Sequence, residues 1–117
     1  MTSKQLVEEV VKGMQEQKAK RITVIDLRKL EAPCEYFVLC EGTSSVHVSS
    51  IATTLRRYVR EQVKAHPFAV DGLDNASWVA MDYGQVIVHI FLRETREFYD
   101  IEHLWADAKL TDIPDLD

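Results

Sequence analysis

The segment "YFVLCEG" at residues 36–42 constrains the fold of this 117-residue chain more than any other stretch. It is a nearly continuous apolar run, which is typical of a strand buried on both faces of a sheet. Gly42 ends the run, and hydroxyl residues suited to an N-cap open a long amphipathic segment at residues 43–66. A strand covered on both faces needs other elements on either side, so the sequence predicts helices packed on a sheet.

The other segments alternate between helical and strand patterns. Residues 2–19 have helical apolar periodicity, and Thr2 with Gln5 resembles a capping box. Further expected elements are strands at 21–27 and 68–70, two strands within 78–91, and a helix capped by Thr95 at 95–108. We therefore expect an α/β (α+β-like) fold with a mixed sheet of about five strands flanked by helices. The unit 36–70 is long enough for a right-handed crossover between parallel strands.

Charge is distributed unevenly along the chain. Residues 1–66 carry eleven Lys or Arg and eight Asp or Glu, whereas residues 67–117 carry three and eleven. A face built from the second half should repel nucleic acid and attract basic protein surfaces, although such acidity also simply keeps a small domain soluble. We place one domain at residues 1–108 and predict an irregular acidic tail at 109–117.

One helix face carries basic residues, but the sequence does not favour it as a nucleic-acid site. Arg56, Arg57, Arg60 and Lys64 lie on the more exposed side of the helix predicted at 43–66, interrupted by Glu61. A solvated helix face is the simpler interpretation, and we expect little direct contact with RNA.

Targeting signals and a redox framework are not evident in the sequence. No run of about eighteen apolar residues occurs, and Glu8 and Glu9 interrupt the N-terminal segment where a signal peptide needs an apolar core. We expect a cytoplasmic protein without membrane contact. We therefore expect Cys34 and Cys40 to be reduced thiols in or near the core.

Patterns for metal binding and nucleophilic catalysis are weak. Only His103 with Asp107 has the i, i+4 spacing of a helical ligand pair, and two ligands do not make a metal site. Neither a G-x-S-x-G elbow nor a Gly-rich phosphate motif occurs. We therefore predict no catalytic residue, no metal and no cofactor.

One alternative enzyme class deserves mention. Gly42, Thr43 and Ser44 resemble the glycine-serine turn of nucleotidyltransferases, whose neighbouring strands carry paired acids for magnesium. Here Asp26 and Asp82 are lone carboxylates on separate predicted strands. A small Mg-dependent nucleotidyltransferase-like enzyme or nucleotide-binding protein remains the alternative function.

The stretch "WVAMDYGQVIVHIF" at residues 78–91 carries polar groups that a plain hairpin does not need. On physical grounds Trp78, Asp82, Tyr83, His89 and Tyr99 fit a core role and a protein-docking role equally well. For Phe98 and Trp105 the core is the favoured interpretation.

Three segments resemble the ribosomal silencing factor family, also called the Iojap family. They are "EYFVLCEGTSS" (35–45), "WVAMDYGQVIVHIF" (78–91) and "REFYDIEHLWADA" (96–108), and the resemblance covers roughly residues 4 to 108. Glu35 and Ala80 depart from the family pattern, which more often has aspartate and a larger aliphatic residue there.

The resemblance implies a fold like that of nucleotidyltransferases without their activity. It further implies binding to the large ribosomal subunit through its fourteenth ribosomal protein (uL14), which blocks joining of the small subunit and represses translation under nutrient limitation. Organelle relatives act in large-subunit biogenesis. From motif position and strand alternation we assign these residues to partner binding: Trp78, Asp82, Tyr83, His89, Phe91, Tyr99 and Glu102. Exposed sheet edges and the aromatic face could also support a homodimer off the ribosome.

Overall fold

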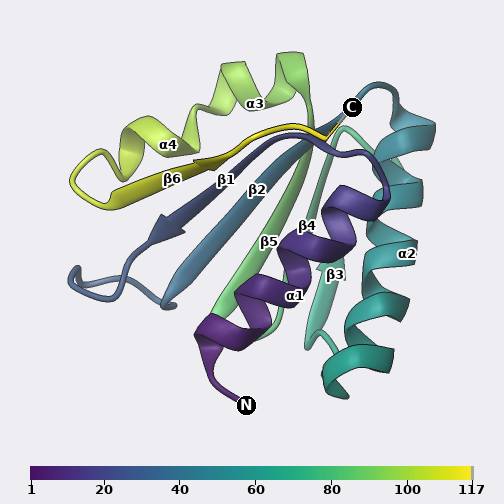
Figure 1. Cartoon of the computed structure of the whole chain (residues 1–117). Coiled ribbons are helices and arrows are strands. Elements are labelled where there is room, and N and C mark those ends of the chain that lie inside the picture. The colour runs from purple at the N-terminus through teal and green to yellow at the C-terminus, as the bar shows by residue number, and fades with distance from the viewer. Residues whose placement is uncertain (117) are drawn as a thin grey trace.

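The computed structural model of the chain describes residues 1–116, in which six strands form one mixed sheet (Figure 1). The strands are β1 (Lys20–Asp26), β2 (Tyr36–Gly42), β3 (Ala69–Asp71), β4 (Trp78–Asp82), β5 (Val86–Leu92) and β6 (Lys109–Ile113). Their order across the sheet is β3-β4-β5-β2-β1-β6. The central strands β2 and β5 run parallel, and the other neighbouring pairs are antiparallel.

Strand β2 is buried at all seven positions, which confirms the prediction made from its apolar run. Val38 and Cys40 belong to a core beneath helices α1 (Ser3–Glu16) and α2 (Ser45–Val63). Phe37 and Leu39 belong to a second core on the opposite face. Because successive side chains of a strand alternate between faces, one strand supplies both cores.

The two faces of the sheet are covered by different helices (Figure 1). Helices α1 and α2 cover one face, and the short helices α3 (Arg93–Tyr99) and α4 (Ile101–Leu104) lie over the other. The capping box predicted for the first helix is present, because Thr2 Oγ1 accepts from the Gln5 N–H while the Gln5 side chain accepts from the Thr2 N–H. Within residues 1–116 no helix is both long enough and apolar enough to cross a bilayer.

The pairing of strands differs from the sequence prediction in two respects. The parallel partner of β2 is β5 and not the segment at 68–70, which forms the short edge strand β3 beside β4. The predicted irregular tail is wrong for residues 109–113, which form β6 along β1. Pairing with β1 satisfies the outer backbone groups of that strand, and a 2.8 Å hydrogen bond from Thr23 Oγ1 to Asp112 Oδ1 holds the register.

The single helix predicted at 95–108 is wrong in its start, its continuity and its end. Helix α3 begins at Arg93, directly after β5, and Thr95 does not cap it. Asp100 adopts a left-handed conformation (φ 48°), and its N–H bonds to the Arg96 carbonyl, which ends α3 before α4 starts. Aspartate tolerates this conformation better than most residues, so the break lies at a position suited to it.

Candidate functional site

Three side chains stack across β4 and β5 on the sheet face that α3 and α4 cover. Trp78 and Phe91 are paired across the two strands, and their ring centroids lie 5.1 Å apart in a stacked arrangement. The Trp78 Nε1–H donates a 3.0 Å hydrogen bond to His89 Nδ1. The indole is thus held on two sides while part of its ring stays exposed.

Helix α3 places two further rings beside this stack. The Tyr99 ring lies 4.7 Å from that of Trp78, and the Phe98 ring 5.1 Å from that of Tyr99. Phe98 is 80% exposed and Tyr99 50%. We call the following partly or fully exposed residues of this region the aromatic surface: Trp78, Ala80, Asp82, Ile87, Phe98 and Tyr99.

The predicted core position of Phe98 is therefore wrong. Helix α3 turns Arg96 toward the sheet, and Phe98 lies on the exposed side of the same helix. Trp105, the other residue predicted for the core, packs edge-on against Phe37 at 6.1 Å between ring centroids and is partly buried.

His89 is buried between Trp78 and Phe37. The rings of Phe37 and His89 pack edge-on, with 4.9 Å between their centroids. Because an indole N–H can only donate, His89 Nδ1 must accept, and the proton of the neutral imidazole sits on Nε2. Within residues 1–116 this Nε2 has no hydrogen-bond partner. Burial lowers the pKa of His89 from its ordinary 6.5 to about 4, so the ring is neutral at pH 7.

This buried imidazole predicts a pH-dependent free energy of unfolding. His89 binds a proton near pH 6.5 in the unfolded chain but only near pH 4 in the folded chain. Its contribution to the free energy of unfolding is therefore complete above pH 6.5 and is lost as the pH drops toward 4. The expected loss is about 3 kcal/mol. Urea denaturation at several pH values across this range gives the free energy of unfolding. That free energy should change less with pH in His89→Gln, which keeps an acceptor for Trp78, than in the wild type. An equal change with pH in both proteins would contradict the assignment of the pH dependence to His89.

Asp82 and Tyr83 have different positions although they are neighbours. Asp82 Oδ1 accepts a 2.7 Å hydrogen bond from the Gly84 N–H, and Gly84 has a positive φ of 90°, so Asp82 closes the turn before β5. Tyr83 points to the core beneath α1 and α2, where burial raises the pKa of its phenol to about 12. Of the residues assigned to partner binding, these retain exposed surface: Trp78, Asp82, Tyr99 and Glu102; Tyr83, His89 and Phe91 are buried.

Glu102 is paired within the chain. Its Oε2 accepts from Arg96 Nε at 3.0 Å and lies 2.9 Å from Arg96 Nη2. The Arg96 side chain is 3% exposed, and its remaining contacts reach three groups of the sheet: the Arg21 carbonyl oxygen at 2.6 Å, Thr23 Oγ1 at 2.9 Å and Glu41 Oε2 at 3.4 Å.

Sequence reasoning assigned no role to Arg96, although this residue opens the quoted segment 96–108. A local signal is that Arg96 is the only Lys or Arg of this segment, which has four acidic residues. The partners in the sheet are 55 to 75 residues away in the chain, and no local pattern indicates them.

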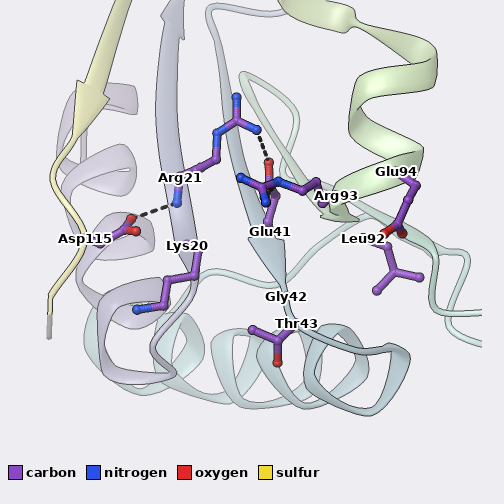
Figure 2. Close-up of a pocket in the computed structure, with 9 residues that line it drawn as sticks. All are labelled: Lys20, Arg21, Glu41, Gly42, Thr43, Leu92, Arg93, Glu94 and Asp115. Atoms are coloured by element: carbon purple, nitrogen blue, oxygen red, sulfur yellow. Dashed lines mark hydrogen bonds and ion pairs between the residues drawn. The ribbon is translucent and has the colours of Figure 1, made fainter.

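A polar hollow of about 380 Å³ opens beside this network, at the end of β2 and the start of α3 (Figure 2). Arg21 donates to Glu41 at 2.9 Å through its guanidinium and to Asp115 at 2.8 Å through its backbone N–H, as the dashed lines mark. Arg93 Nε lies 3.9 Å from the same Glu41 carboxylate. The lining contains equal numbers of basic and acidic side chains: Lys20, Arg21 and Arg93 against Glu41, Glu94 and Asp115.

Gly42 and Thr43 line this hollow, which is where a nucleotidyltransferase-like turn would lie. Of the carboxylates that line the hollow, Glu41 pairs with arginines and Asp115 accepts from the Arg21 N–H. Asp26, which pairs with Arg28 at 2.8 Å, lies at the opposite end of β1. Across the described part of the chain, no group of three His, Cys, Asp or Glu side chains is arranged to hold a metal ion. The geometry does not assemble the oxygen ligands that two-metal chemistry requires.

The two cysteines offer no nucleophile. Cys34 and Cys40 are free and buried, as expected from the sequence. Burial raises the pKa of the Cys34 thiol to about 11 and also raises that of Cys40, so both stay protonated at neutral pH.

Comparisons with known proteins agree on one family. The family model described as "Ribosomal silencing factor during starvation" matches residues 1–117. Ribosomal silencing factor RsfS of Bacillus subtilis is 32% identical over 116 residues, which cover 97% of this chain and 95% of that protein. "Mitochondrial assembly of ribosomal large subunit protein 1" of Mus musculus is 30% identical over 102 residues, or 86% of this chain and 45% of that longer protein.

A solved structure has the same fold. The crystal structure of a protein from Chromobacterium violaceum superposes with a TM-score of 0.86 at 26% identity, covering 91% of this chain and 88% of that one. The mixed α/β architecture of this chain is therefore shared with that solved structure.

Proposed function

Because this chain belongs to the ribosomal silencing factor family, we propose that it binds the large ribosomal subunit and sterically blocks association with the small subunit. Such a block represses translation when nutrients are scarce. The name of the family model supports the silencing role, and the name of the mouse relative supports the large subunit as the partner. That second name also favours a role in large-subunit assembly as a further candidate function.

The aromatic surface is the observation that carries the proposal. Phe98 and Tyr99 expose aromatic rings, and Tyr99 rests on Trp78, which is itself held by Phe91 and His89. Exposed apolar groups of this size commonly mark interaction sites, and aromatic residues on a rigid support are favoured as binding hot spots. We infer that the partner covers these rings.

A basic ribosomal protein, uL14, fits the charge around the aromatic surface. Asp82 belongs to this surface, and Glu97 and Asp100 are exposed neighbours of Phe98 and Tyr99 in the chain. Carboxylates at the edge of an interface can accept charge-assisted hydrogen bonds from Arg or Lys, and they guide the approach of a basic partner.

The same acidity disfavours contact with ribosomal RNA at this surface. The exposed arginines Arg56, Arg57 and Arg60 lie on α2, which covers the opposite face of the sheet (Figure 1). Little direct contact with RNA is therefore expected where the protein docks. Off the ribosome, a second copy of the chain could cover the aromatic rings, and dimerisation would then compete with ribosome binding.

We further propose that the protein is not an enzyme and acts in the cytoplasm, where its target is found. The rival function is magnesium-dependent nucleotide binding at the polar hollow of Figure 2. Isothermal calorimetry with ATP and magnesium decides between them: we expect no binding heat at millimolar nucleotide, and saturable heat would favour the rival.

Co-sedimentation tests the proposed partner. Purified large and small subunits are centrifuged separately with the protein through sucrose. The protein should pellet with large subunits in a saturable manner and stay in the supernatant with small subunits. Failure to pellet with large subunits would refute the proposed function.

A further inference from the structure

We propose that Arg96 is the positioning residue of the aromatic surface, because its guanidinium holds α3 and α4 on the sheet. The inference rests on the proposed function, since it states what makes the docking surface competent. Few other side chains hold these helices on the sheet. Within residues 93–104, all of which the structure describes, the buried side chains are Arg96 in α3 and Ile101 in α4.

A helix normally packs on a sheet through an apolar stripe, and α3 does the opposite. It directs its charged Arg96 inward and its apolar Phe98 outward, with Tyr99 half exposed against Trp78. Burying a guanidinium is costly unless its donors find acceptors. The position of α3 therefore depends on the acceptors that the sheet offers to Arg96.

The sheet supplies these acceptors by a local irregularity in β1. Arg21 has a positive φ of 50°, and the register with β2 shifts between Lys20 and Thr23. This bulge takes the Arg21 backbone out of the regular ladder, so its carbonyl oxygen accepts from Arg96 Nη1 at 2.6 Å and its N–H donates to Asp115. A non-glycine residue in this conformation is strained, and the surrounding hydrogen bonds offset the strain.

The remaining contacts link the same guanidinium to β2 and α4. Glu41 lies 3.4 Å from Arg96 Nη1, and Glu102 of α4 pairs with the Nε and Nη2 edge. One side chain thus joins β1, β2, α3 and α4. Residues 97–101 lie between Arg96 and Glu102 in the chain, and they include both exposed rings of α3.

Arg96→Lys is the most informative substitution. Lysine keeps the charge, but a single ammonium cannot reproduce the planar set of donors that reaches Arg21, Thr23 and Glu102 together. Arg93→Lys is the matched control, because Arg93 lies on the same helix, is mostly exposed and is 3.9 Å from Glu41. Glu102→Gln is a second, milder variant that weakens the same link and preserves side-chain size.

The first readout is amide hydrogen exchange. Exchange at residues 97–104 should accelerate at least about tenfold in Arg96→Lys and to a smaller degree in Glu102→Gln, while amides of α2 exchange as in the wild type. Arg93→Lys should match the wild type throughout. If residues 97–104 exchange at the wild-type rate in both variants, the positioning role is overturned, whatever the protein binds.

The second readout separates positioning from general destabilisation. The affinity of Arg96→Lys for large subunits should fall about tenfold, because only the fraction with an ordered surface binds. If Arg96 acts through the rings, adding Arg96→Lys to a variant that lacks both rings, Phe98→Ala with Tyr99→Ala, should lower the affinity much less than Arg96→Lys does alone. If Arg96→Lys lowers the affinity by the same factor with and without the rings, the inference is overturned. Absence of wild-type binding would instead refute the proposed function and leave the exchange result to decide the role of Arg96.

Discussion

Replacing Phe98 and Tyr99 together by alanine is expected to weaken binding to the large subunit by at least about a hundredfold. Aromatic residues at the centre of an interface commonly contribute about 2 kcal/mol each when truncated, and each 1.4 kcal/mol corresponds to about a tenfold change in Kd. Both rings are substantially exposed, so their loss should change the free energy of unfolding little. Titration of labelled protein with large subunits gives the Kd directly.

Val46→Ala is the control for this double variant. Val46 is also an exposed apolar residue, but it lies in the first turn of α2, on the helical layer across the sheet from α3. Its replacement should leave the affinity unchanged. Equal Kd values for the wild type and the Phe98/Tyr99 double variant would remove these rings from the interface and return the search to other faces.

Phe91→Ala is expected to lower the free energy of unfolding by about 4 kcal/mol, the range found for truncating a large buried aromatic residue. Phe91 is fully buried in the second core, with its ring stacked on Trp78 and 6.0 Å from that of His89. The cavity would lie directly beneath the aromatic surface. Urea denaturation monitored by circular dichroism measures the loss.

Phe68→Ala provides the matched deletion at an exposed position. The Phe68 ring lies over Gly84 and is largely exposed, so its removal should cost less than about 1 kcal/mol. A loss below 1 kcal/mol in Phe91→Ala would contradict the structural role assigned to this residue. Because Phe91 is buried and stacked on Trp78, we treat it as structural support for Trp78. From the sequence, Phe91 was assigned to partner binding.

The parts of the fold that follow from local patterns could be predicted from the sequence. The apolar run of β2 indicated burial on both faces, and Thr2 with Gln5 indicated the start of α1, since both signals depend on adjacent residues. The prediction of a mixed sheet with helices holds for the same reason. Strand β6 was missed because its residues are mostly exposed, and only pairing with the distant β1 makes it a strand.

The candidate site could be predicted in part. Trp78 and Asp82 were assigned together with Tyr83 to partner binding, but the structure separates them, because Tyr83 faces the other core. The exposure of Phe98 could not be predicted, because a continuous helix at 95–108 would have placed it on the apolar stripe with Ile101 and Trp105. The break at Asp100 and the inward turn of Arg96 change that arrangement, and both depend on tertiary contacts.

A subunit-joining assay tests the central claim most directly. Purified small and large subunits are mixed in the presence of magnesium, and light scattering follows formation of the joined particle with increasing amounts of protein added to the large subunit first. The wild type should lower the joined fraction in proportion to its occupancy, and the Phe98/Tyr99 double variant should lower it only at much higher concentration. Normal joining at concentrations of wild type that saturate the large subunit would contradict the account.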